Sequence, residues 1–128
     1  MKINIPLVIR IIIYSFIVFL WFLWTLSNVL IKSYRLKTEV TPLQFNIPFS
    51  KVSIKSKDGL YLAGWWITNK LTNSAIILCH GLGADKSDML NFAPFLYENG
   101  YNVLLFDFRG HGENKSKYTS LGYFEVND

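Results

Sequence analysis

The chain has 128 residues, of which 51% are apolar, and 13 Lys and Arg against 9 Asp and Glu give a net charge of +4. The length indicates one domain, and a charged fraction of only 17% excludes collagen-like and charge-driven disordered chains. Without Lys2 and Arg10, 11 basic residues remain against the 9 acidic ones, and no stripe collects them, so no nucleic-acid partner is expected.

Residues 11–31 form an apolar run of 21 residues without a charge. As a helix this run would be about 31 Å long, close to the ~30 Å hydrocarbon core of a bilayer. We therefore predict a single-pass transmembrane helix over residues 11–31, flanked by residues 1–10, with the lipid bilayer as its partner. A cleaved signal peptide is the alternative, but its apolar core is usually shorter. Basic residues lie on both sides of the run, so the orientation in the membrane is not predicted.

Residues 32–50 are expected to be a connector, since Pro42 and Pro48 prevent a regular helix there. Residues 51–57 alternate between apolar and polar side chains, and a second strand-like run covers residues 60–67. Asp-Gly between two such runs is a strong hairpin signal. We therefore expect a partial α/β domain over residues 51–128 that begins with a β-hairpin.

Two continuous apolar runs follow, at residues 75–79 and 103–106. Such runs are typical of strands that are covered on both faces in a parallel sheet. The intervening segment is long enough for a crossover helix. Asn91 is the expected N-cap of this helix, with Pro94 in its first turn, and the Asn-Gly pair at 99–100 is expected to end it.

Cys79, at the end of the first apolar run, is the only cysteine of the chain. It excludes an internal disulfide and a multi-cysteine zinc site. Its apolar neighbours indicate a small buried hydrophobic residue rather than a nucleophile.

Both apolar runs end in polar, glycine-rich loops. The first loop reads His80, Gly81, Leu82 and Gly83, and the second reads Asp107, Phe108, Arg109, Gly110, His111, Gly112 and Glu113. In open α/β sheets, ligands bind at the carboxyl ends of the strands. A glycine-rich loop at this place can direct backbone N–H groups at a developing oxyanion.

This order of hairpin, strand, His-Gly-x-Gly, helix, strand and Asp-Phe-Arg-Gly-His-Gly-Glu resembles the N-terminal part of an α/β-hydrolase. The resemblance covers residues 42–128 and is strongest to membrane-anchored, serine-aminopeptidase-like hydrolases. It implies that the backbone N–H of Leu82 binds the oxyanion, while His80 and Gly83 shape the turn. It also implies that the loop at residues 107–112 borders the active site and that His111 is not the catalytic histidine. The implied activity of a full-length relative is esterase, lipase or peptidase-like acyl hydrolysis.

The chemistry of this family needs a serine in Gly-x-Ser-x-Gly, followed along the chain by an acid and a histidine. No Gly-x-Ser-x-Gly occurs in the 128 residues, so no catalytic residue is assigned. The resemblance implies a fold that is truncated before the nucleophile and inactive alone, for which a separate C-terminal chain is a candidate partner. We expect marginal stability and an exposed apolar edge at the strand near residues 101–106. No cofactor or metal is expected.

Two other functions remain open. A small membrane-anchored interaction module could use the same half-sheet without catalysis. A dinucleotide-binding module is suggested by Gly81 and Gly83 after a strand and Asp107 at the end of the next one. Against it, Lys86 stands where the third glycine belongs, and Pro94 delays the helix. A metal site built from the two histidines and Asp107 is weakly supported, because their spacing is not diagnostic.

Overall fold

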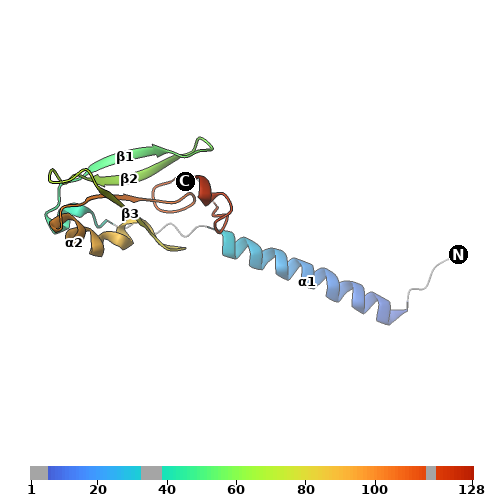
Figure 1. Cartoon of the computed structure of the whole chain (residues 1–128). Coiled ribbons are helices and arrows are strands. Elements are labelled where there is room, and N and C mark those ends of the chain that lie inside the picture. The colour runs from blue at the N-terminus through green and yellow to red at the C-terminus, as the bar shows by residue number, and fades with distance from the viewer. Residues whose placement is uncertain (1–5, 33–38, 115–117) are drawn as a thin grey trace. The chain divides into compact units, whose positions relative to one another are not determined.

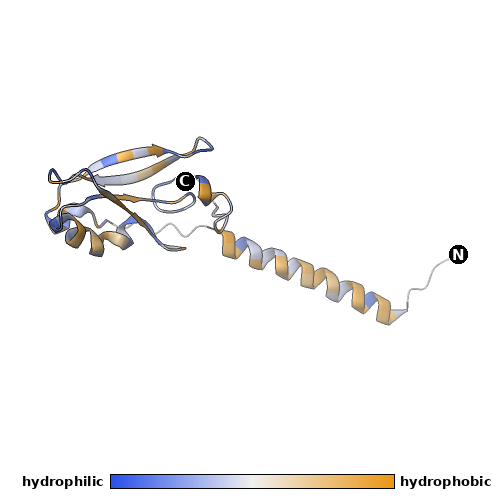
Figure 2. Ribbon diagram, in the orientation of Figure 1, coloured by the Kyte–Doolittle hydropathy of each residue, from blue (hydrophilic) through white to orange (hydrophobic). Residues whose placement is uncertain are grey.

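The structure is a computed structural model that describes residues 6–32, 39–114 and 118–128. The chain divides into two compact units, Met1–Ile31 and Lys32–Asp128. The first unit contains one helix, α1 (Leu7–Ile31), none of whose residues is buried. Figure 2 shows apolar residues along its whole length. The predicted helix is confirmed and begins at Leu7 rather than at residue 11. By length and composition it is able to cross a membrane, although a signal sequence near the N-terminus has the same length and composition.

The second unit contains a four-stranded sheet with the order β1-β2-β4-β3 (Figure 1). Its strands are β1 (Ser50–Lys55), β2 (Tyr61–Ile67), β3 (Ala75–Cys79) and β4 (Asn102–Phe106). β1 and β2 pair antiparallel around the turn that contains Gly59, whose φ of 91° is the left-handed conformation that glycine tolerates. The predicted hairpin and the parallel pair of β3 and β4 are both confirmed.

β4 lies in the interior of the sheet, because its second neighbour is the antiparallel strand β2. Gly64 of β2 allows this contact, since a Cβ there would lie only 2.9 Å from the carbonyl oxygen of Leu105. The expectation that the strand near residues 101–106 would form the exposed edge is therefore wrong. Among the described residues, the open parallel edge belongs to β3.

The two apolar strands also differ in how well they are covered. β4 is buried on both faces, as predicted, whereas the residues of β3 alternate between exposed and half-buried. Ile77 is 59% exposed, and Cys79 is exposed rather than buried. The prediction for Cys79 failed because a continuous apolar run was read as a strand with a covering layer on each face. In the described part of the chain, β3 has such a layer on one face only.

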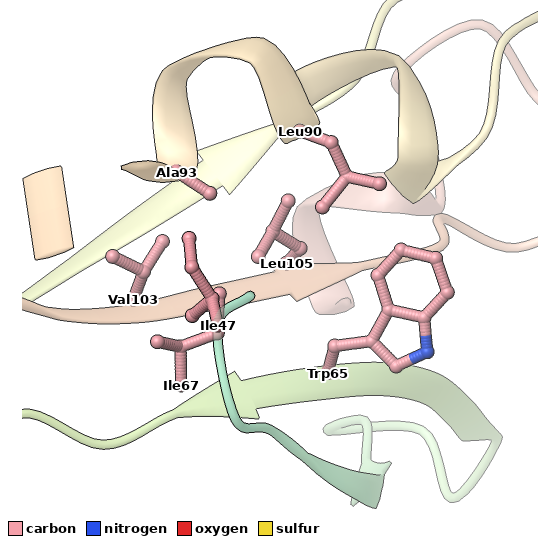
Figure 3. Packing of buried hydrophobic residues seen from close by; sticks show 7 residues of the cluster. All are labelled: Ile47, Trp65, Ile67, Leu90, Ala93, Val103 and Leu105. Carbon is pink, nitrogen blue, oxygen red and sulfur yellow. The ribbon is translucent and has the colours of Figure 1, made fainter. Parts of the chain in front are cut away.

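The hydrophobic core lies between the sheet and the crossover segment (Figure 3). It contains Ile47, Trp65, Ile67, Leu90, Ala93, Val103 and Leu105. Leu90 belongs to the 3-10 helix η2 (Lys86–Phe92), and Ala93 begins α2 (Ala93–Glu98). Two further 3-10 turns, η1 (Pro42–Phe45) and η3 (Glu125–Asn127), lie outside the sheet. The core thus fixes the crossover segment against β2 and β4.

The crossover helix begins differently from the prediction. Asn91 is not its N-cap; instead the carboxylate of Asp85 caps η2 by accepting the N–H of Ser87 at 2.8 Å. The chain then continues into α2, with Pro94 in its first turn. The sequence pattern missed η2 because its turns are tighter than those of an α-helix, so apolar residues recur at a different spacing. The predicted end at residues 99–100 is confirmed: Asn99 is the C-cap and Gly100 has a φ of 88°.

Candidate active site

The carboxyl ends of β3 and β4 lie next to each other, since Cys79 is paired with Phe106. The loop at residues 80–83 therefore adjoins the loop at residues 107–112. The rings of His80 and His111, one from each loop, have centroids 5.0 Å apart. The structure thus brings the two predicted loops together at the carboxyl ends of the parallel strands.

His80 ties the first loop to the second through its imidazole. Its Nε2 accepts the backbone N–H of Phe108 at 3.1 Å, so the proton of the neutral ring lies on Nδ1. Nδ1 then donates to the carbonyl of Gly81 at 2.8 Å. Burial lowers the pKa of His80 below its ordinary value of 6.5, and nearby His111 adds to this effect. His80 is therefore held as a neutral imidazole that bridges the loops.

His111 makes the reciprocal bridge from the second loop. Its Nε2 accepts the backbone N–H of Gly83 at 3.2 Å, and its Nδ1 lies 2.9 Å from the carbonyl of Arg109. Both ring nitrogens are thus occupied by backbone groups, with the proton on Nδ1. An imidazole with both nitrogens engaged in this way is not available as a general base.

The backbone N–H of Leu82 differs from those that follow it. Gly83 donates to His111, and Ala84 donates to the carbonyl of Gly81. Within the described residues, the N–H of Leu82 has no such acceptor. Leu82 lines a largely apolar cavity of about 350 Å³ together with His80, Phe108, His111, Thr119 and Leu121. The loop therefore presents one unused donor next to a cavity.

Asp107 is fully buried and has a structural function. Its carboxylate accepts the backbone N–H of Lys86 at 2.8 Å and that of Glu113 at 3.0 Å, and it pairs with Nζ of Lys86 at 2.6 Å. Lys86 itself lies over the ring of Trp65 at 4.8 Å. Gly112 completes this arrangement, because any Cβ there would collide with the Asp107 carboxylate. Asp107 is thus unable to bind the ribose of a dinucleotide.

Arg109 connects the β-hairpin to the C-terminal residues. Its guanidinium contacts Asp58 in the hairpin turn at 2.8 and 3.0 Å, and its Nε lies 2.8 Å from the carboxylate of Asp128. Hydrogen bonds from Arg109 hold the pKa of Asp58 well below its usual value. Gly110 follows in close contact with the backbone of Tyr118, where a Cβ would lie 2.6 Å from the carbonyl oxygen. Residues 109 and 110 therefore fix the second loop rather than face a ligand.

Glu125 fixes the opposite wall of the cavity. Its carboxylate accepts the backbone N–H groups of Ser120 and Gly122 at 2.7 and 2.8 Å, and the hydroxyl of Thr119 at 2.8 Å. Burial raises the pKa of Glu125, but hydrogen bonds from Ser120 and Thr119 outweigh it and lower the pKa to about 2. The segment that closes the cavity is thus ordered by an ionised carboxylate.

Sequence reasoning missed two residues that hold the site together, Lys86 and Asn114. The side chain of Asn114 accepts the N–H of Ala63 at 2.8 Å and donates to the carbonyl of Phe108 at 3.1 Å, so it joins β2 to the second loop. No local sequence pattern marks Lys86 or Asn114 as a site residue, because each binds a partner that is distant in the sequence. Across residues 6–32, 39–114 and 118–128, no group of three or more His, Cys, Asp or Glu could hold a metal ion.

Comparisons with known proteins agree with this architecture. The sequence model of the alpha/beta hydrolase fold family matches residues 74–125. The crystal structure of the esterase Pf2001 from Pyrococcus furiosus superimposes with a TM-score of 0.70 at 35% identity, over 75% of this chain and 39% of that one. This chain is thus similar to one part of a larger α/β protein.

The similarity to curated relatives also covers only one part of each larger protein. The uncharacterized protein YqkD of Bacillus subtilis is 33% identical over 75 residues, which are 59% of this chain and 25% of YqkD. The uncharacterized membrane protein YNL320W of Saccharomyces cerevisiae is 28% identical over 83 residues, which are 64% of this chain and 29% of that protein. The chain therefore spans only about a quarter of the length of the curated relatives that it matches.

Proposed function

Lys32–Asp128 has the N-terminal part of an α/β-hydrolase fold, and from this premise we propose that it supplies the oxyanion-binding loop of a membrane-anchored serine hydrolase. In this proposal α1 is a single-pass anchor in the lipid bilayer. The nucleophile, the acid and the base come from residues other than these 128, because Gly-x-Ser-x-Gly does not occur among them. The chain alone is then inactive.

One observation carries the proposal: the N–H of Leu82 is without an acceptor in the described residues, while its loop is held from both sides by histidines. An oxyanion hole needs such a donor, fixed before the reaction and unused in the resting protein. The second donor would be the N–H of the residue that follows the nucleophile.

The cavity next to Leu82 indicates the kind of substrate. Its size of about 350 Å³ and its apolar walls from Phe108 and Leu121 are compatible with a small acyl group. The similarity to an esterase points in the same direction. We therefore propose hydrolysis of small acyl esters, with lipase or peptidase-like acyl hydrolysis as related activities.

The test is labelling by a fluorophosphonate, which reacts with an activated serine. The native protein is captured from membranes with an antibody against residues 32–128, and its mass, labelling and ester hydrolysis are measured. Leu82→Pro removes the donor N–H, and we expect a loss of roughly 10²-fold or more in hydrolysis. Leu82→Ala keeps the N–H and is the matched control, with a much smaller change expected.

Two results would contradict the proposal. One is a captured protein that hydrolyses no ester and does not react with fluorophosphonate. The other is an equal loss of hydrolysis in both Leu82 variants, since this would assign the effect to the side chain.

The open edge of β3 favours a second candidate, a non-catalytic membrane-anchored interaction module. Ile77 is 59% exposed on this strand, and the edge has no strand partner within the described residues. Such an edge can accept a strand from another polypeptide, for example a separate C-terminal chain that completes the sheet. Capture of a stoichiometric partner chain without any hydrolysis would support the module; capture with hydrolysis would support completion of an enzyme.

A further inference from the structure

The two histidines hold the proposed oxyanion loop by a reciprocal pair of hydrogen bonds. A backbone N–H of the second loop donates to His80, and a backbone N–H of the first loop donates to His111. The two bonds differ in what they fix. His80 is attached at the beginning of the first loop, whereas His111 holds Gly83, the residue directly after Leu82, whose N–H has no acceptor within the described residues.

We propose that His111 is a positioning residue that orients the Leu82 N–H by holding Gly83 with a neutral imidazole. This inference rests on the proposed function, because it assigns a purpose to the orientation of that N–H. His111 does not touch the reacting atoms in this proposal. It acts through the backbone of Gly83.

The position of His111 is itself determined by several contacts. The backbone N–H of His111 donates to the carbonyl of Phe108 at 3.0 Å, and the ring Nδ1 is 2.9 Å from the carbonyl of Arg109. Arg109 is in turn fixed by Asp58 and Asp128. The side chain of His111 is almost completely buried, with 3% of the residue exposed. The imidazole therefore has one orientation, with Nε2 directed at the first loop.

Gly83 has a φ of 79°, and because glycine adopts positive and negative φ about equally well, the residue itself does not fix this conformation. Gly83 has no side chain to pack, and apart from its chain neighbours nothing lies within 4 Å of the position that a Cβ would occupy. The hydrogen bond from the N–H of Gly83 to Nε2 of His111 connects the main chain of Gly83 to the second loop. Without this bond, the turn at residues 81–84 would retain, among the described residues, the hydrogen bond from the N–H of Ala84 to the carbonyl of Gly81 at 3.2 Å. The N–H of Leu82, between these residues, would lose its fixed direction.

The first experiment observes the imidazoles directly in the 128-residue chain in nanodiscs. The chain has two histidines, so long-range ¹⁵N spectra contain two imidazole patterns, which His80→Gln assigns. At pH 7.5 we expect both rings to be neutral with the proton on Nδ1. A His111 ring that carries its proton on Nε2 rather than on Nδ1 would overturn the proposal.

The second experiment compares two variants of similar side-chain length. His111→Gln offers an oxygen acceptor to Gly83, and His111→Met offers only a thioether sulfur, which is a weak acceptor. In the Met variant we expect the Gly83 amide to exchange with solvent about fivefold faster, the factor that one intramolecular hydrogen bond contributes, and less change in the Gln variant. Unchanged amide signals in β2 and β4 would show that both variants fold. Equal exchange of Gly83 in two folded variants would contradict the proposal.

The third experiment measures hydrolysis by the protein captured from membranes. His111→Met is expected to lower kcat with little change in KM, because the oxyanion develops in the transition state, and His111→Gln is expected to restore part of the loss. A KM effect alone would overturn the positioning function. If the unmodified protein has no hydrolase activity, the proposed function fails, whereas the imidazole spectra still decide whether His111 holds Gly83.

Discussion

The two histidines of this chain have their nitrogens committed to the backbone. Each accepts one N–H and lies close to one carbonyl oxygen. The sequence placed His80 in the turn of the first loop and His111 in the loop beside the site, but it did not show that the two rings bind the backbone of each other's loops. The difference arises because β3 and β4 are parallel neighbours, which places residues 28 positions apart within hydrogen-bonding distance.

The neutral state of His80 predicts how stability depends on pH. Burial keeps its pKa in the folded chain below the ordinary value of 6.5, so the unfolded chain takes up this proton first as the pH falls. The stabilisation is complete above about pH 6.5 and is lost as the pH falls through the pKa of the folded state. We expect a lower midpoint of thermal unfolding at pH 5.5 than at pH 7.5.

The control for this prediction is His80→Gln, which removes the titrating group and should reduce the pH dependence. The nearby groups that also act on His80 are His111, Asp107 and Asp85. Asp58 and Glu125, whose pKa values are lowered, contribute at a more acidic pH, because they lose stabilisation only below their ordinary values of 3.8 and 4.5. The prediction fails if the parent chain and the variant lose stability equally between pH 7.5 and pH 5.5.

At the level of the elements, β3 is the least protected strand. It was predicted as a buried strand from the same pattern as β4, yet three of its five residues are exposed. The pattern of apolar residues records which faces can be covered, but it does not say whether the covering layer lies within these 128 residues. The hairpin of β1 and β2 was predictable because its signal, Asp-Gly between two strand-like runs, is entirely local.

The exposed strand predicts self-association of the chain at high concentration. Ile77→Lys introduces a charge on β3, and charged residues on edge strands oppose pairing with other chains. We expect this variant to reduce the aggregated fraction in light scattering. Leu71→Lys is the matched control, since Leu71 is 86% exposed but lies in the loop before β3. An equal reduction by both variants would assign the effect to net charge rather than to the edge.

At the level of the whole molecule, the chain combines an apolar helix without buried residues with an α/β unit. α1 has 25 residues, most of them apolar, and is long enough to span a bilayer. Our proposal of a membrane anchor predicts that the protein stays with membranes after extraction at alkaline pH. Deletion of residues 1–31 should release the remainder to the soluble fraction. Release of the complete protein by alkaline extraction would contradict the anchor.

The sequence alone determined the elements whose signals are local or highly specific. These are the apolar helix, the hairpin, the two apolar strands and the resemblance to an α/β-hydrolase, which the fold confirms. Periodicity and turn residues act within a few positions along the chain, so they can be read without coordinates.

Only the tertiary structure decided which strands and which side chains are neighbours. It placed β4 inside the sheet and β3 at its open edge, and it moved the cap of the crossover helix from Asn91 to Asp85. It also paired Lys86 with Asp107 and joined His111 to Gly83. These contacts depend on strand order and register, which are set by the packing of distant segments and have no local signature in the sequence.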